Sequence, residues 1–161
     1  MLKTDFEKTF HECVISVDPK YVFPYAGKTY VVLGADLVYE NYNFRGKGEN
    51  CDEYIFFDYT SKMTGIYLVE RKDNEASKSV KVEKIHDQLQ GGADFIADFI
   101  EKDHSRAVFQ FDFRPVLVSR TIRIGLNNRL KLKTICLHGR KKRILHAEIG
   151  KKTKFPPLEN K

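Results

Sequence analysis

The spacing of apolar side chains along the chain predicts two helices. In Leu2–Cys13 apolar residues recur every three to four positions, which is typical of a short amphipathic helix. Val80–Lys102 keeps a period near 3.6 and predicts one long helix that packs on a sheet. Gly91 and Gly92 inside it would each cost about 1 kcal/mol relative to alanine. We therefore expect the helix backbone to approach another element closely there, with a break in the helix as the alternative.

Runs of β-branched and aromatic residues predict strands at Thr29–Leu33, Cys51–Tyr59, Gly65–Val69 and Arg106–Ser119. The polar turn Thr60–Thr64 joins the second and third of these into a hairpin. Pro115 either interrupts the last strand or marks an edge or a bulge, because proline cannot donate to a sheet ladder. Since this strand follows the long helix, we expect a right-handed crossover that places it beside the hairpin.

The end of the chain is basic. Two alternating runs, Lys133–His138 and Arg143–Ile149, are joined by Gly139-Arg140-Lys141-Lys142, which predicts a β-hairpin with a strongly basic tip. Residues 151–161 are expected to form a loose tail after a single domain of residues 1–150. The elements together predict an α/β fold, a mixed sheet flanked by helices with a C-terminal basic β-hairpin. We expect an edge strand or an irregular segment at Val14–Tyr25 and a loop at Glu40–Asn50. The pattern of Thr121–Leu132 is ambiguous.

Charged residues gather at one end of the predicted hairpin. Asp52 opens its first strand, and Glu70 and Lys72 close the second. In an antiparallel pair the start of one strand lies beside the end of the other, and residues two apart share a face, so we expect these three side chains to meet. Two carboxylates, with water and a phosphate oxygen, suffice to hold Mg²⁺. A lysine beside them can stabilise charge on the phosphate or position the attacking water, as metal-assisted phosphodiester hydrolysis requires.

An Asp followed by Glu-x-Lys, on a hydrophobic hairpin that leads into a long helix, resembles the PD-(D/E)xK nuclease superfamily. The resemblance covers roughly Val14–Ser119, with Cys51 where a proline often precedes the first acidic residue. It implies a restriction-endonuclease-like fold, Asp52 and Glu70 as ligands of Mg²⁺ or Mn²⁺, and Lys72 as a catalytic residue. The other interpretation is a strand-entry residue at Asp52 and a surface ion pair between Glu70 and Lys72, worth at most about 1 kcal/mol.

Further candidates lie outside these three residues. Several branches of the superfamily carry Gln or Lys on the helix after the motif, which implies a catalytic role for Gln88 and a nucleic-acid contact at Lys84. The branch with Tyr four residues after that Gln is not matched, because Gly92 stands there. Basic residues that could neutralise phosphates, or simply sit in water, are Arg45 and Lys47 in the loop and Arg140, Lys141, Lys142 and Arg143 in the hairpin.

Charge is divided unevenly between the two parts of the chain. Residues 1–102 carry 13 basic and 18 acidic side chains, whereas residues 103–161 carry 15 basic and 4 acidic ones. A positive surface beside an acidic pocket suits a nucleic-acid enzyme, although a solvated basic tail has the same composition. No apolar run approaches the ~20 residues of a membrane span. The 3 cysteines are far apart, which indicates reduced thiols and a cytoplasmic protein.

The sequence therefore predicts a metal-dependent endonuclease, and the resemblance implies DNA more than RNA as its substrate. It also implies settings such as defence, mobile elements or repair, and a homodimer or larger complex. Two alternatives stay open, a nuclease-like module that binds nucleic acid without cutting it and a protein-interaction subunit. The interaction subunit alone predicts no nucleic-acid affinity, whereas the other two predict affinity that falls steeply with salt.

Overall fold

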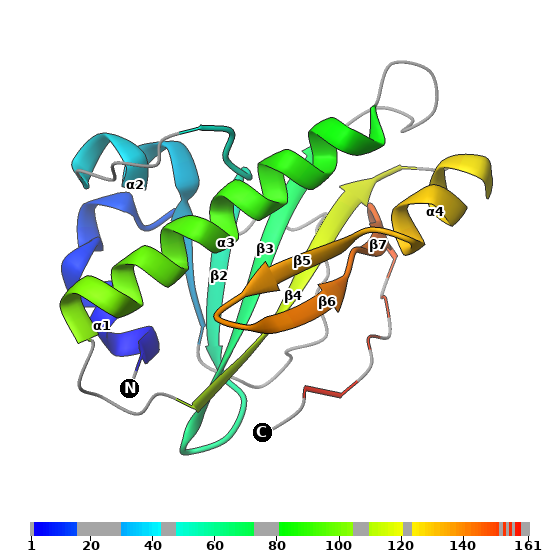
Figure 1. Cartoon of the computed structure of the whole chain (residues 1–161). Coiled ribbons are helices and arrows are strands. Elements are labelled where there is room, and N and C mark those ends of the chain that lie inside the picture. The colour runs from blue at the N-terminus through cyan, green and yellow to red at the C-terminus, as the bar shows by residue number, and fades with distance from the viewer. Residues whose placement is uncertain are drawn as a thin grey trace.

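The computed structural model describes residues 2–15, 30–42, 48–72, 81–104, 110–120, 124–151, 153, 155, 157 and 158. Within these residues, helices flank a five-stranded mixed sheet, and a two-stranded sheet lies beside it (Figure 1). The α/β class, the mixed sheet and the flanking helices are confirmed. No described helix is long and apolar enough to cross a bilayer.

The five-stranded sheet contains the predicted hairpin at its centre. Neighbouring strands among the first three run antiparallel to each other, and the last two strands run parallel to the third. The hairpin turn is held by Thr60, whose Oγ1 accepts hydrogen bonds from the backbone N–H groups of Lys62 (3.2 Å) and Met63 (3.0 Å). In order across the sheet, the strands are β1 (Tyr30–Gly34), β2 (Glu53–Asp58), β3 (Met63–Lys72), β4 (Gln110–Ser119) and β7 (Leu145–Glu148).

The helices are α1 (Leu2–Thr9), α2 (Ala35–Asn41), α3 (Val82–His104) and α4 (Ile124–Lys131). α1 and α3 confirm the two predicted helices, with the residues after α1 forming a short 3-10 turn. α2 and α4 were not predicted from the sequence. α3 lies across one face of the sheet (Figure 1). On this face the ring of Phe6 packs against the rings of Phe56 and Phe99, with a centroid distance of 4.3 Å to each.

The two glycines of α3 allow the helix to sit directly on the segment that enters β2. A Cβ atom on Gly91 would lie 1.7 Å from the carbonyl oxygen of Glu49, and one on Gly92 would lie 2.6 Å from Sγ of Cys51. The helix runs unbroken through both positions. Close packing, the favoured interpretation of the sequence, is therefore confirmed, and it fixes α3 over the end of the hairpin that carries Asp52.

β4 is paired along its full length with β3 but only along its second half with β7. β7 pairs with Val116–Ser119, so the first half of β4 has an edge on that side. Pro115 lies one residue before the paired stretch. Its missing N–H therefore costs no bond to β7, which confirms the edge interpretation of this proline.

The C-terminal hairpin differs from its prediction. It consists of β5 (Thr134–Leu137) and β6 (Arg140–Arg143), and Leu145–Glu148 leaves it to form β7. The turn is His138-Gly139, with φ values of 52° and 79°. A two-residue turn with both φ values positive is the tightest hairpin connection. The basic residues therefore form a strand instead of a tip, which corrects the sequence interpretation.

Gln90 joins this hairpin to α3. Its side-chain amide donates to the carbonyl oxygen of Cys136 at 2.8 Å and accepts from the Cys136 N–H at 2.9 Å. The side chain of Gln90 thus forms the two backbone hydrogen bonds that a neighbouring strand would form with Cys136 of β5. His86, one turn earlier, lies 3.0 Å from the carbonyl oxygen of Thr134 through Nε2.

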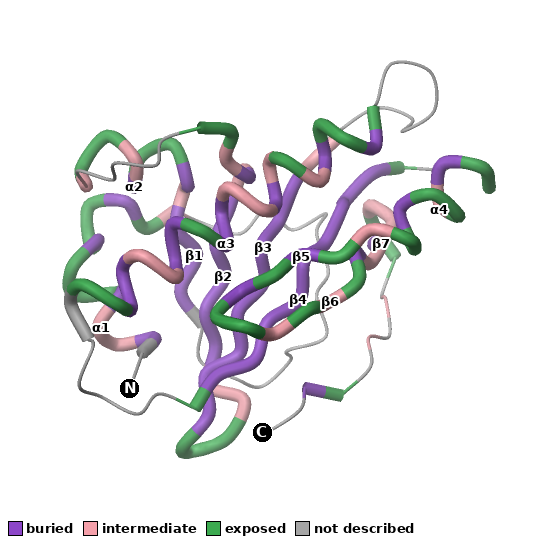
Figure 2. Tube along the Cα trace, in the orientation of Figure 1, coloured by how far each residue is buried: buried purple, intermediate pink, exposed green. Residues whose placement is uncertain are grey.

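The second face of the sheet is also buried (Figure 2). Ile55, Tyr67 and Val116 are inaccessible to solvent there. Phe155 and Leu158, within the expected loose tail, pack against this face. The guanidinium of Arg114 lies over the rings of both Tyr67 and Phe155, 5.6 Å and 5.5 Å from their centroids. The sequence does not predict this packing.

Candidate active site

The register of β2 and β3 brings the three charged residues of the hairpin together. Glu53 pairs with Val69, so Asp52 lies beside the end of β3. The Asp52 N–H donates to the carbonyl oxygen of Val69 at 2.8 Å, and Asp52 Oδ2 accepts from the Arg71 N–H at 2.7 Å. Both the backbone and the carboxylate of Asp52 are therefore fixed on β3.

Glu70 and Lys72 share one face of β3. Lys72 Nζ lies 2.9 Å from Glu70 Oε1. Arg71, between them, pairs instead with Glu53 through Nη1 and Oε1 at 3.3 Å. This alternation separates two charged pairs on one end of the hairpin. Only the Glu70–Lys72 pair lies on the face that carries α3.

Glu70 is buried to an unusual degree for a carboxylate, with 1% of its surface exposed. Burial, followed by the negative charge of Asp52, raises the pKa of Glu70 from 4.5 to about 7, although the hydrogen bond and charge of Lys72 partly oppose this. Burial, then Glu70 and Asp52, also raise the pKa of the Cys51 thiol. Negative charge is thus concentrated here beyond what Lys72 balances.

Two buried acceptor oxygens near this end of the sheet have no hydrogen-bond partner in the described part of the structure, Oε2 of Glu70 and Oε1 of Gln88. A buried polar atom left without a partner costs about 1–3 kcal/mol. A cation beside Glu70, with its bound water, would satisfy such oxygens and offset the charge of both carboxylates. The donor set at Asp52 and Glu70 therefore fits a hard divalent cation.

Two carboxylates limit the kinds of cation that such a site could hold. Among the described residues, no group of three or more His, Cys, Asp or Glu side chains is placed to hold a metal ion. Zinc sites use three or four such side chains. Mg²⁺ keeps several waters and needs only one or two carboxylates together with substrate phosphate. Asp52 and Glu70 suit Mg²⁺ or Mn²⁺ on these grounds.

The candidates on α3 lie at the same end of the sheet. Because β3 and β4 run parallel, the helix between them returns in the opposite direction, and its first turns lie beyond the end of β3 (Figure 1). Gln88 is half-buried and lies one turn before Gly92, which packs on Cys51. Lys84 is exposed. Arg45 and Lys47 lie outside the described residues.

Side chains of the basic strand β6 alternate between an inward and an exposed position. Arg140 and Lys142 turn inward to the fully buried Asp112, with Lys142 Nζ 3.1 Å from Oδ2 and Arg140 Nη1 3.7 Å from Oδ1. Arg140 also donates to the carbonyl oxygen of Phe111. Lys141 and Arg143 are exposed. The alternation of a strand explains this division.

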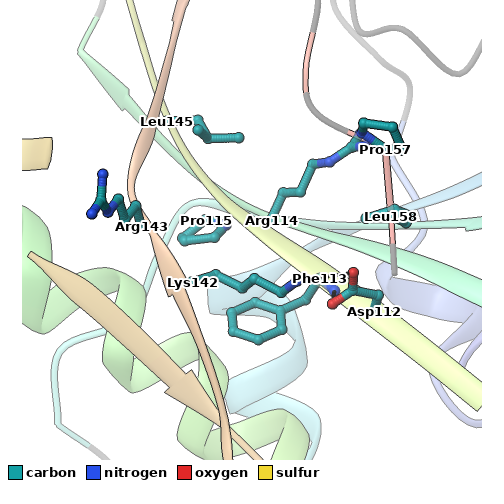
Figure 3. Close-up of a pocket in the computed structure, with 9 residues that line it drawn as sticks. All are labelled: Asp112, Phe113, Arg114, Pro115, Lys142, Arg143, Leu145, Pro157 and Leu158. Carbon is teal, nitrogen blue, oxygen red and sulfur yellow. Dashed lines mark hydrogen bonds and ion pairs between the residues drawn. The ribbon is translucent and has the colours of Figure 1, made fainter. Parts of the chain in front are cut away.

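Asp112 and Lys142 also line a pocket of about 210 Å³ at the edge of β4. Figure 3 shows Lys142 reaching toward Asp112, Arg114 extending toward Pro157, and Arg143 turned away from the pocket. The two inward cations hold the hairpin to β4 and are committed to that contact. Lys141 and Arg143 are exposed and form no ion pair within the described residues.

Polar residues that sequence analysis missed continue the site across the sheet. Leu117 pairs with both Glu70 and His146, and Ser119 pairs with both Lys72 and Glu148. Paired residues of neighbouring strands point to the same face, so Ser119, His146 and Glu148 share the face of Glu70. Ser119 Oγ lies 2.7 Å from His146 Nε2. No signal in the sequence shows that β7 pairs with β4, so this row could not be found there.

Comparisons of the chain with protein-family models, with curated proteins and with solved structures give no match.

Proposed function

We propose that the protein is a metal-dependent nuclease that hydrolyses phosphodiester bonds of DNA. The observation that carries the proposal is the buried carboxylate of Glu70, whose Oε2 has no partner within the described residues and which lies beside Asp52 and Lys72. Buried carboxylate oxygens usually have hydrogen-bond partners, so this oxygen requires a physical explanation. Strongly perturbed carboxylates of this kind are typical of functional sites.

Asp52 and Glu70 would hold the cation. Mg²⁺ or Mn²⁺ bound there would acidify a water and offset charge on the phosphate. Asp52 is held in place by the Arg71 N–H, and Glu70 by Lys72. Both carboxylates are therefore positioned before any ligand binds, which lowers the cost of ordering them.

Lys72 would act on the phosphate. Its ammonium has three N–H donors, of which one serves Glu70, and its side chain is 29% exposed. The remaining donors can reach a phosphate oxygen on which negative charge grows as water attacks. Gln88 Oε1, a buried acceptor without a partner in the described structure, would accept a hydrogen bond from water at this end of the sheet.

The substrate and the setting are inferred from the sequence. DNA is proposed over RNA because of the resemblance of the Asp52, Glu70-x-Lys72 motif to PD-(D/E)xK nucleases. The cysteines of the described residues, Cys13, Cys51 and Cys136, are all free, which suits a reducing compartment such as the cytoplasm. A homodimer would bring two such sites together for a double-strand cut.

A module that binds nucleic acid without cutting it is the second candidate. The exposed cations Lys141 and Arg143 favour it, since their charges need no metal to bind phosphate. It gives no account of the unsatisfied oxygen of Glu70. For this reason we place it second.

The test is cleavage of linear duplex, single-stranded and branched DNA, and of RNA, with Mg²⁺, Mn²⁺ or EDTA. Glu70→Gln and Lys72→Ala proteins are compared with Glu53→Gln, which changes a similarly buried carboxylate on the opposite face of the hairpin. Circular dichroism confirms that each variant is folded. We expect cleavage that requires metal, falls at least about 100-fold in the first two variants, and persists in the third.

Other results would redirect the assignment. Binding without cleavage by the unaltered protein would favour the non-catalytic module. Neither binding nor cleavage would favour a protein-interaction subunit. Cleavage that persists in EDTA, or in the Glu70→Gln protein, would exclude the proposed metal site.

A further inference from the structure

The row of polar residues continues beyond the metal site toward the free edge of the sheet. Glu70 and His146 lie on one line across β3, β4 and β7. Neighbouring strands are about 4.8 Å apart, so the Cα atoms of Glu70 and His146, which lie two strands apart, are separated by about 10 Å. One strand of duplex DNA carries a phosphate about every 3.4 Å along the helix axis. The row is therefore long enough to contact more than one phosphate of a strand.

At the end of this row lies a hollow of about 390 Å³ between α4, the start of β7 and the segment that follows β7. Its polar lining comes from Asn127, Lys131, Arg143, His146 and Thr153, and Ile144, Leu145 and Phe155 supply apolar surface. Asn127 and Lys131 are four residues apart on α4, so they present one face of that helix. No carboxylate is among the described residues that line the hollow.

The two cations of the hollow are available to a ligand. Lys131 and Arg143 are exposed, and neither forms an ion pair within the described part of the chain. Arg140 and Lys142, by contrast, are committed to Asp112. The nearest carboxylate in the row, Glu148, lies 3.0 Å from Lys151. The hollow therefore carries unbalanced positive charge.

Ser119 and His146 form the link between the metal site and the hollow. Ser119 is fully buried and His146 half-buried, so the imidazole faces outward from a fixed hydroxyl. Burial lowers the pKa of His146. A neutral imidazole that binds Ser119 through Nε2 keeps Nδ1 for a second hydrogen bond.

We propose that the DNA strand leaves the metal site past His146, whose ring is held by the buried Ser119, and that its following phosphates are bound in the hollow by Asn127, Lys131 and Arg143. The inference rests on the proposed nuclease function, since it takes Glu70 and Lys72 as the place where the strand is cut. It assigns the binding surface to the edge of the sheet at β7. The inward face of the basic hairpin takes no part.

The test is DNA binding by the 161-residue chain in EDTA, so that metal-dependent cleavage does not interfere. Fluorescence anisotropy with labelled duplex and single-stranded DNA, between about 50 and 200 mM salt, gives the affinity and its salt dependence. Lys131→Ala and Arg143→Ala are compared with Lys8→Ala, which removes an equally exposed charge from α1 near the opposite edge of the sheet. All of these side chains are exposed, so the variants should fold.

We expect Lys131→Ala and Arg143→Ala each to weaken binding several-fold and to reduce the salt slope by about 1, with Lys8→Ala unchanged. His146→Gln should weaken binding without changing the slope. The inference is overturned if Lys8→Ala weakens binding as much, if neither hollow variant has an effect, if the unaltered protein does not bind DNA, or if it binds RNA more tightly than DNA.

The binding experiment tests the proposed surface, and the cleavage experiment tests the proposed nuclease function. If the hollow variants lose affinity but the unaltered protein never cuts DNA, the nuclease proposal fails and the surface stands. If Glu70→Gln abolishes cleavage while the hollow variants bind normally, the nuclease proposal stands and the surface is wrong.

Discussion

Replacing Glu70 with Gln should change how stability depends on pH. Burial and the charge of Asp52 raise the pKa of Glu70 from 4.5 to about 7. The unfolded chain therefore loses this proton at lower pH than the folded protein does. Between pH 4.5 and about 7 the folded state holds more protons, so the free energy of unfolding falls as pH rises.

The size of the effect follows from the same pKa. A change in pKa from 4.5 to about 7 corresponds to about 3 kcal/mol of stability, which is fully present below pH 4.5 and fully lost above about pH 7. Gln does not titrate, so the Glu70→Gln protein should gain about 3 kcal/mol relative to the unaltered protein between these limits. For a chain of this size this is about 6–12 °C in Tm.

The assay is urea or thermal unfolding of both proteins in EDTA at a series of pH values. Adding Mg²⁺ at pH 8 should restore the lost stability of the unaltered protein, because the cation binds the ionised carboxylates of the folded state only. The Glu70→Gln protein should lose this response, and Glu53→Gln should keep it. A stability difference between the unaltered and Glu70→Gln proteins that stays constant within about 0.5 kcal/mol across pH would refute the reasoning.

Three further predictions concern neighbouring features. Lys72→Ala should lower the cleavage rate about 100-fold or more while Mg²⁺ still raises Tm; a loss of the Tm response would make Lys72 part of the metal site itself. Gly91→Ala should destabilise the protein by about 1–3 kcal/mol, because the new Cβ would lie 1.7 Å from a backbone oxygen. Gly125→Ala, whose new Cβ would have no atom within 4 Å, should not destabilise it. Equal urea midpoints for the two variants would contradict the close packing at Gly91. Gln90→Ala should cost about 1–3 kcal/mol by removing both bonds to β5, and hydrogen exchange at Cys136 should speed up; unchanged exchange would show that other contacts hold the hairpin.

Local patterns were sufficient for the hairpin and its charged end. Apolar β-branched runs with a polar turn between them predict β2 and β3, and antiparallel pairing then places Asp52 beside Glu70 and Lys72. Strand alternation also separates Arg71 from its two neighbours, as the structure shows. These features depend on residues close in the chain, whose relative positions the secondary structure alone decides.

Features that depend on distant pairing were not predictable. Arg140 and Lys142 were expected at an exposed hairpin tip, but their partner Asp112 lies 28 to 30 residues earlier on β4. The pairing of β7 with β4, which brings His146 to Ser119, has the same origin. Sequence composition marks the region as basic without showing which of its charges are already bound within the protein.

The claim on which the rest depends is that Asp52 and Glu70 hold one divalent cation. Anomalous diffraction from crystals soaked in Mn²⁺ tests it most directly. The account predicts a single strong peak between the two carboxylates, about 2.0–2.2 Å from Asp52 and Glu70 oxygens, which disappears in the Glu70→Gln protein. No peak at saturating Mn²⁺, or a peak bound only elsewhere, would contradict it.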